Sequence, residues 1–123
     1  KEFQFEVPSP ELKLNVDRTQ IEQILINLLK NAREACSRKS DKKIQVKARK
    51  LSAGNTTLTI SDNGEGILPD VLDKIFVPFF TTKTSGSGIG LSLCKQIMTL
   101  HEGSINVKSE VGKGSSFILT FPK

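Results

Sequence analysis

Two asparagines spaced four residues apart, Asn27 and Asn31, are the first side chains in the sequence that could act together chemically. Both lie in a stretch with apolar residues at helical spacing, so their amides should lie one above the other on a helix flank. An amide oxygen is a hard ligand that suits Mg²⁺, particularly when phosphates supply the negative charge. The alternative is that both side chains simply hydrogen-bond to nearby backbone, which is ordinary for helical asparagine.

A carboxylate followed by glycines comes next, in Asp62-Asn63-Gly64-Glu65-Gly66, directly after a run rich in β-formers. A carboxylate at the end of a buried strand can accept a hydrogen bond from an exocyclic amine such as adenine N6. The glycines would let a flat ligand approach the backbone. The alternative is a plain turn, because Asp-Asn-Gly is strong turn chemistry.

The segment Gly86-Ser87-Gly88-Ile89-Gly90-Leu91 precedes a second helical pattern. Small residues leave backbone N–H groups accessible, and a helix N-terminus attracts anions such as phosphates. The segment matches neither the dinucleotide-binding fingerprint nor the Walker pattern. Upstream, Lys83 is a flexible cation that could reach a terminal phosphate, or else a solvated lysine.

Three phenylalanines surround a proline in Phe76-Val77-Pro78-Phe79-Phe80, ahead of a polar loop. We expect this segment to anchor a lid, with residues 76–88 forming a mobile loop. A satellite hydrophobic cluster under a long loop is a compatible alternative.

Hydrophobic periodicity predicts the elements that position these residues. Asp17 and Gln20 form a start like a capping box, for a helix that runs to about Arg38. Gly103 is well placed to end the second long helix. The predicted strands are 2–7, 12–16, 43–51, 56–61, 104–109 and 116–121, and the other helices are 70–75 and 89–101. This order predicts an α+β fold, a two-layer sandwich with helices on one face of a mixed, mostly antiparallel sheet.

The composition narrows the class of protein. A chain of 123 residues fits one domain, 1–123, and apolar positions spread along it exclude disorder. Its longest uninterrupted apolar runs are only a few residues, which excludes a membrane span. One histidine and two cysteines are too few for a zinc cluster or a disulfide scaffold, and they favour a reducing cytosol.

In combination, these motifs resemble the catalytic, ATP-binding domain of sensor histidine kinases, within the GHKL ATPase superfamily. The string Pro78-Phe79-Phe80-Thr81-Thr82-Lys83 is similar to the nitrogen-regulation and transport-sensor branch. The matching boxes are Asn27–Ala32 (N box), Asp62–Ile67 (G1 box), Phe76–Lys83 (F box), Gly86–Leu91 (G2 box) and the closing motif Gly112–Phe117.

The resemblance implies ATP and Mg²⁺ as cofactors and assigns roles to single residues. Asn31 would ligate Mg²⁺, with Asn27 beside it near the phosphates, and Lys83 would contact phosphate oxygens. Asp62 would accept from the adenine amine, Gly66 would make room for the ring, and Ser115 would stand where relatives often have threonine. The implied nucleotide-binding set is Asn27, Asn31, Asp62, Gly64, Gly66, Ile67, Lys83, Gly86, Gly88, Ile89, Gly90, Leu91 and Ser115.

One position departs from the family pattern. Glu34 stands where many members carry a lysine or arginine near the phosphates, so Lys83 or Arg33 would have to compensate.

The resemblance also implies partners outside the chain. The acceptor would be a histidine on a separate dimerisation domain, because His101, the only histidine, reads as a helix C-terminal residue favoured by the dipole. A response regulator would act downstream. We expect the isolated domain to be monomeric and cytoplasmic, in a parent kinase that could be membrane-anchored.

Other functions fit the sequence less well. A self-contained ATPase of the superfamily, as in gyrase, mismatch-repair or heat-shock proteins, has a glutamate where Asn27 stands, and an amide is no general base. The Phe box and the N-box asparagine disfavour a serine kinase acting on an anti-sigma partner. Seven basic residues from Arg38 to Lys50 suggest nucleic-acid binding as an alternative function. No aromatic residues lie among them to stack on bases, so we expect a solvated strand face. A degenerate domain that only docks stays open.

Overall fold

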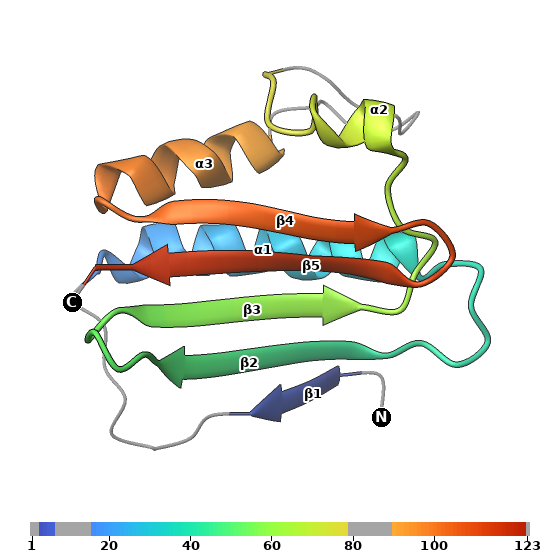
Figure 1. Ribbon diagram of the computed structural model, residues 1–123, viewed down its shortest axis with the longest axis horizontal. Helices are drawn as coiled ribbons and strands as arrows, with labels where there is room; N and C mark the ends of the chain where they lie inside the picture. The colour runs from blue at the N-terminus through green and yellow to red at the C-terminus, as the bar shows by residue number, and fades with distance from the viewer. Residues whose placement is uncertain (1–2, 7–15, 79–89, 123) are drawn as a thin grey trace.

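The computed structural model describes residues 3–6, 16–78 and 90–122, which form two layers (Figure 1). One layer is a five-stranded sheet in the order β1-β2-β3-β5-β4, with β1 parallel to β2 and the other neighbours antiparallel. The two long helices, α1 and α3, cover one face of it, which confirms the predicted fold class. The elements are β1 (Phe3–Glu6), α1 (Arg18–Ala35), β2 (Ile44–Lys50), β3 (Thr56–Asp62), α2 (Pro69–Leu72), α3 (Gly90–Leu100), β4 (Ser104–Glu110) and β5 (Gly114–Phe121).

Helix α1 begins as the sequence predicts and ends earlier. The Asp17 carboxylate accepts from the Gln20 backbone N–H at 3.0 Å, which satisfies one of the free donors of the first turn. The helix ends at Ala35 and not near Arg38. The Ala35 carbonyl accepts from the Glu65 N–H at 3.2 Å, and the Lys39 N–H turns back to the Cys36 carbonyl at 2.9 Å. The buried Cys36 Sγ lies 3.4 Å from the side-chain oxygen of Asn63.

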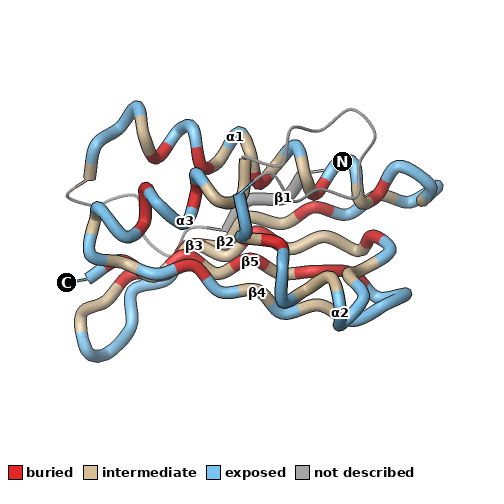
Figure 2. Tube along the Cα trace, turned by 90° about the horizontal axis from the view of Figure 1, so that it is seen from above, coloured by how far each residue is buried: buried red, intermediate tan, exposed pale blue. Residues whose placement is uncertain are grey.

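The core lies between the layers and follows the alternation of the strands (Figure 2). Along β3 and β5, every second residue faces the helices, and Ile60 pairs with Phe117 across the two strands. The Phe117 ring also meets Phe76 edge-on, with centroids 6.5 Å apart, so Phe76 packs against the core, and its role as an anchor for a lid stays a prediction. Phe79, Phe80 and the remainder of the expected mobile loop lie outside the described residues.

Two further expectations meet the structure only in part. The helix expected at 70–75 is a single turn, Pro69–Leu72, with proline at its first position. Of the strand expected at 12–16, residues 12–15 lie outside the described part, and Val16 belongs to the bend before α1. No helix in the described ranges is long and apolar enough to cross a bilayer.

Gly103 takes part in the end of α3, as predicted, but not as the residue with a positive φ. The Gly103 N–H donates to the Met98 carbonyl at 2.8 Å and the Glu102 N–H to the Thr99 carbonyl at 3.0 Å, the bond pair of a Schellman motif. The residue with positive φ in this motif is Glu102, at 60°, and not Gly103. Gly103 is needed for space, because a Cβ there would lie 2.3 Å from the Thr120 carbonyl oxygen.

His101 lies at the end of α3, as expected, and makes two specific hydrogen bonds. Its Nδ1 lies 2.9 Å from the Ile97 carbonyl oxygen, and its Nε2 accepts from the Asp17 backbone N–H at 3.0 Å. A carbonyl only accepts, so Nδ1 is the donor of the first bond. The two bonds link the end of α3 to the start of α1.

We predict that Glu102→Gly stabilises the protein by about 1 kcal/mol, because a non-glycine residue in the left-handed region carries a steric cost of that order. The free energy of unfolding from urea denaturation measures this. The matched control is Gln23→Gly at an exposed position of α1, which should destabilise by about 1 kcal/mol. Destabilisation by both substitutions would contradict the backbone argument.

Candidate functional site

One side of α1 connects the predicted motifs. Asn27, Asn31 and Ala35 are spaced four residues apart and share this side. At one end, a Cβ built on Gly90 would lie 3.1 Å from Asn27 Oδ1, so α3 starts against the asparagine. At the other end, the Glu65 N–H donates to the Ala35 carbonyl at 3.2 Å. Asn31 therefore lies between the start of α3 and the loop after β3.

Asn27 makes the hydrogen bond to nearby backbone that was the alternative to a ligand-binding role. Its Nδ2 donates to the Gln23 carbonyl at 3.0 Å, a bond within the helix. This uses the donor end of the amide, while Oδ1 is the atom nearest to Gly90. Both Asn27 and Asn31 are half-buried. The metal-ligand role of Asn31 stays a prediction.

Asp62 is the last residue of β3 and carries a perturbed carboxylate. Its Oδ1 accepts from the Gly64 N–H at 2.8 Å, so the turn chemistry of Asp-Asn-Gly is also present. Burial raises the pKa of this carboxyl, and the backbone N–H groups of Gly64 and Ser115 lower it by less. A half-buried carboxylate with spare lone pairs is a strong acceptor for a ligand amine.

The loop Asn63–Ile67, which follows Asp62, is held from two sides. The Gly112 N–H donates to the Glu65 carbonyl at 2.9 Å, next to the contact with α1. A Cβ on Gly64 would lie 2.5 Å from the Ala35 carbonyl oxygen. Gly66 has a φ of +80°, and a Cβ there would lie 2.4 Å from the Glu110 carbonyl oxygen. The fold therefore requires glycine at both positions, with or without a ligand. That Gly66 makes room for a purine ring stays a prediction.

Ser115 lies directly across from Asp62 in the β3–β5 ladder and is buried. Its Oγ is 2.8 Å from the Oγ of Ser109, whose oxygen also accepts from the Ile67 N–H at 2.7 Å. The sequence reasoning missed Ser109. The strand alternation could have indicated it. Ile105 and Val107 face inward, so position 109 does too, and there a serine interrupts the apolar series.

Asn63 is a second residue that the sequence reasoning did not single out for a role. Its Oδ1 accepts from the Lys43 N–H at 2.9 Å, and its Nδ2 donates to the Asp41 carbonyl at 2.8 Å. Together with the Cys36 contact, these bonds join the loop after β3 to the connection between α1 and β2. Asn63 therefore fixes the position from which Asp62 acts.

The cysteines supply no nucleophile to the site. Burial raises the pKa of the Cys94 thiol to about 12, and burial with the nearby Asp62 charge raises that of Cys36. The described residues also hold no group of three or more His, Cys, Asp or Glu side chains that could bind a metal.

The phosphate-binding side of the predicted site is described only in part. Leu91, the second residue of α3, is half-buried and packs against the core. Lys83, Gly86, Gly88 and Ile89 lie outside the described residues, and their predicted roles stay predictions.

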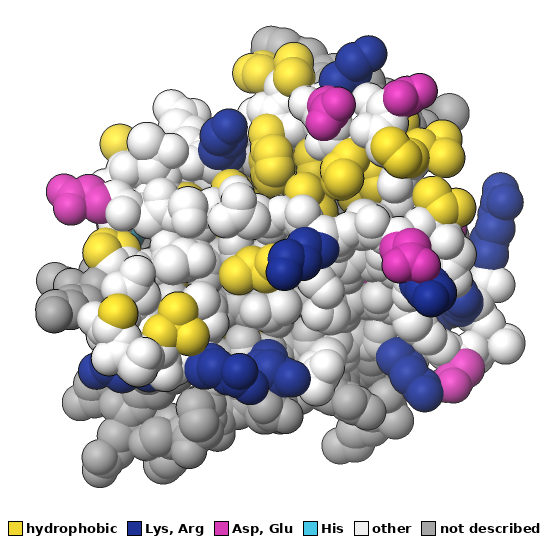
Figure 3. Space-filling view, in the orientation of Figure 1, with side chains coloured by type: hydrophobic (Ala, Val, Ile, Leu, Met, Phe, Trp, Pro, Cys, Tyr) yellow, Lys and Arg dark blue, Asp and Glu magenta, His cyan; other side chains and the backbone are white. Residues whose placement is uncertain are grey.

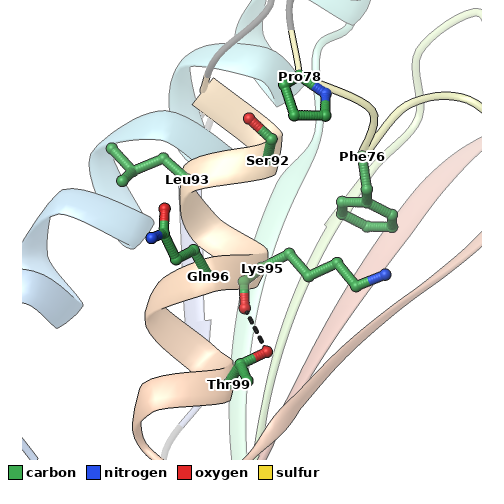
Figure 4. A pocket seen from close by; sticks show the side chains of 7 residues that line it. All are labelled: Phe76, Pro78, Ser92, Leu93, Lys95, Gln96 and Thr99. Carbon is green, nitrogen blue, oxygen red and sulfur yellow. Dashed lines mark hydrogen bonds between the residues drawn. The ribbon is translucent and has the colours of Figure 1, made fainter.

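Two hollows in the described surface are lined by other residues than Asn31 and Asp62. One lies by α3 and the segment that leads to Pro78, and is lined by Phe76, Ser92 and Lys95 among others (Figure 4). The other is lined by Lys30, Arg33, Lys42 and Glu34, so the acidic residue that departs from the family pattern lies among basic ones.

Basic side chains are also spread over the open face of the sheet, with acidic ones among them (Figure 3). Lys47 and Arg49 alternate with the buried Ile44 and Ala48 in β2, as expected for a solvated strand face.

The fold and the motifs define a class of protein, the ATP-binding domains of the histidine kinase type, and comparison with known proteins agrees. Residues 16–123 match the family described as histidine kinase-, DNA gyrase B-, and HSP90-like ATPase. The chain therefore belongs to this family.

Curated relatives are sensor kinases. The chain is 39% identical over 110 residues to the sensor histidine kinase ZraS of Salmonella typhimurium, covering 89% of this chain and 23% of the relative. It is 42% identical over 109 residues to the signal transduction histidine-protein kinase AtoS of Escherichia coli, covering 89% and 18%. The chain thus spans about a quarter or less of the length of these relatives.

Solved structures agree with the fold. The catalytic domain of histidine kinase ThkA in a nucleotide-free form superposes with a TM-score of 0.86 at 36% identity, covering 99% of this chain and 80% of that one. A complex of ThkA with the response regulator protein TrrA matches with a TM-score of 0.78 at 32% identity, covering 99% and 34%. Homology to such catalytic domains places the chain among protein-histidine kinase domains.

We predict that Asp62→Asn does not lower the melting temperature of the nucleotide-free protein at pH 7. The folded-state pKa of Asp62 is raised, so the folded protein holds this proton more tightly than the unfolded chain. The ionised carboxylate therefore lowers the free energy of unfolding at a pH above the raised pKa. This loss decreases as the pH falls through the folded-state pKa toward the unfolded-state value. Thermal unfolding at pH 7 and in acid measures the difference.

The exposed Asp73→Asn variant serves as a control and should change stability by less than about 0.5 kcal/mol. A clear loss of stability in Asp62→Asn at pH 7 would show that the carboxylate is a structural element.

Proposed function

We propose that this chain binds Mg-ATP beside Asn31 and Asp62 and donates the γ-phosphoryl group to a histidine on a separate dimerisation domain. The observation that carries the proposal is the convergence on one side of α1. The start of α3 meets Asn27 there, and the loop that follows Asp62 meets Ala35. Three motifs distant in sequence thus border one polar strip.

In this proposal each part has a separate task. The Asp62 carboxylate accepts from the purine amine, while Gly66 and Ile67 border the ring. The Asn31 oxygen holds Mg²⁺, which when bound neutralises phosphate charge. The amides of Gly90 and Leu91 offer the N-terminus of α3 to the phosphates. Lys83, Gly86, Gly88 and Ile89 would complete the phosphate contacts. Phosphoryl transfer needs such positioning more than covalent chemistry from the protein.

The acceptor in this proposal lies on another domain. His101 is the only histidine in the sequence, and both of its ring nitrogens are engaged in hydrogen bonds. The side chain nearest the start of α3 is the Asn27 amide, which cannot activate water as a general base. The first fact disfavours His101 as the acceptor, and the second disfavours hydrolysis. Together they favour transfer to a partner. We extend the proposal to a response regulator downstream and to a cytoplasmic location of this domain.

Mg-ADP should raise the melting temperature of the wild-type chain. At one hundred times the dissociation constant, binding stabilises the folded state by about 2.7 kcal/mol. Asn31→Ala and Asp62→Asn should abolish the shift by removing the metal ligand or the charged acceptor. Asn106→Ala, on the open face of β4, is the matched control and should keep the full shift. A wild-type protein with no shift at millimolar nucleotide would contradict the proposal.

Incubation with γ-labelled ATP should leave the isolated chain unlabelled and without brisk hydrolysis. Addition of the parent kinase's dimerisation domain should give label on that domain, in the acid-labile form typical of phosphohistidine. The control is the same domain with its acceptor histidine replaced by glutamine. Label on His101 would contradict the assignment, and rapid phosphate release by the chain alone would favour the self-contained ATPase.

A further inference from the structure

Three polar residues form a row across the helix-covered face of the sheet. Asp62 on β3 pairs with Ser115 on β5, and Ser115 pairs with Ser109 on β4. The preceding inward row on the same strands is apolar, with Phe117 flanked by Ile60 and Val107. The core therefore gives way to a line of oxygen atoms at the edge where the candidate site lies.

The hydrogen bonds of Ser109 determine how its hydroxyl is oriented. Its Oγ lies 2.7 Å from the Ile67 nitrogen, 3.2 Å from the Gly114 carbonyl oxygen and 2.8 Å from Ser115 Oγ. A hydroxyl has one proton and two lone pairs. The Ile67 N–H can only donate and the Gly114 carbonyl can only accept. All three contacts are satisfied together only when the Ser109 proton goes to Gly114 and the Ser115 proton goes to Ser109.

This orientation makes Ser115 an acceptor toward the site. With its proton directed to Ser109, its oxygen presents only lone pairs, and Asp62 beside it is an acceptor-only carboxylate when ionised. Two neighbouring acceptors suit an amino group, which carries two protons. They disfavour a carbonyl oxygen in the same place, because it brings no proton and meets two lone-pair surfaces.

We propose that Ser109 is a positioning residue that sets base specificity by orienting the Ser115 hydroxyl and holding the Ile67 N–H. The ligand class that it favours is a 6-aminopurine nucleotide over a 6-oxopurine nucleotide. The inference rests on the proposed nucleotide site and adds to it a residue that contacts no ligand. Ser109 acts through Ser115 and through the backbone of the loop that follows Asp62.

The test compares the dissociation constants of Mg-ADP and Mg-IDP. ADP carries a 6-amino group and an unprotonated N1, and IDP carries a 6-oxo group and an N1 proton. Wild type should prefer ADP. Ser109→Ala frees the Ser115 hydroxyl to rotate and donate toward an oxo group, so the preference should fall by about tenfold, the value of one hydrogen bond. Ser109→Thr keeps the hydroxyl and should restore the preference.

The sheet supplies a matched control. Ser61 on β3 and Ser116 on β5 form another cross-strand hydroxyl pair, 2.8 Å apart. This pair is next to the Asp62–Ser115 pair along the two strands and faces the opposite side of the sheet. Ser116→Ala should leave the ADP preference at the wild-type value. Ser115→Ala should lower the preference as Ser109→Ala does, and the double substitution should add nothing further, since the two residues act as one unit.

The outcomes separate this inference from the proposed function. Equal weakening of both nucleotides by Ser109→Ala, with an unchanged ratio, would show a merely structural role and overturn the inference while ATP binding stands. Failure of wild type to bind either nucleotide would overturn both. If Ser109→Ala does not fold, Ser109→Cys keeps the size with a weaker donor, and a wild-type ratio in that variant would overturn the inference.

Discussion

The close approach of the backbone after β3 to two other parts of the chain is the constraint on which the site depends. The Gly64 and Gly66 backbones lie against carbonyl groups of Ala35 and Glu110, closer than any side chain allows. Hydrogen bonds from Glu65 to α1 and from Gly112 to Glu65 join the same three segments. Asp62 therefore starts a loop that cannot shift without moving both α1 and the turn between β4 and β5.

The helix layer is arranged around this constraint. The start of α1 meets the end of α3 through Asp17 and His101, and Asn27 meets the start of α3 at Gly90. The two helices are therefore antiparallel along the first half of α1, and its second half extends beyond α3 to the loop. Asn31 lies in this second half, between the start of α3 and the loop, so its surroundings follow from packing and not from a local signal.

Short-range patterns accounted for most of the fold. Alternation located the strands of the described region, and the spacing of apolar residues with Asp17 located α1. The predicted end of α1 was about three residues too late, because the Ala35 carbonyl accepts from the distant Glu65 N–H, which no local pattern shows. The end of α3 was predicted to within one residue, and Gly103 takes part in it, but the left-handed position falls on Glu102.

The site was less predictable than the fold because its function depends on pairings across strands. The motif order pointed to Asp62, Asn31 and Ser115, which are typical of the family. Ser109 carries no motif, and its importance is visible only when β4 is paired with β5. Asn63 likewise looked like turn chemistry until its side chain was seen to join two connections.

The different reasons for retaining Asp62 and its neighbouring glycines affect how related sequences should be read. Gly64 and Gly66 are retained by the folded backbone, whether or not a ligand is bound. The Asp62 carboxylate is a burden on the empty domain, since burial disfavours its charge. Under the proposed function, relatives that no longer bind nucleotide should therefore keep the glycines and lose the aspartate. The carboxylate, and not the glycine-rich signature, would then separate a nucleotide-binding member from one that has become a scaffold.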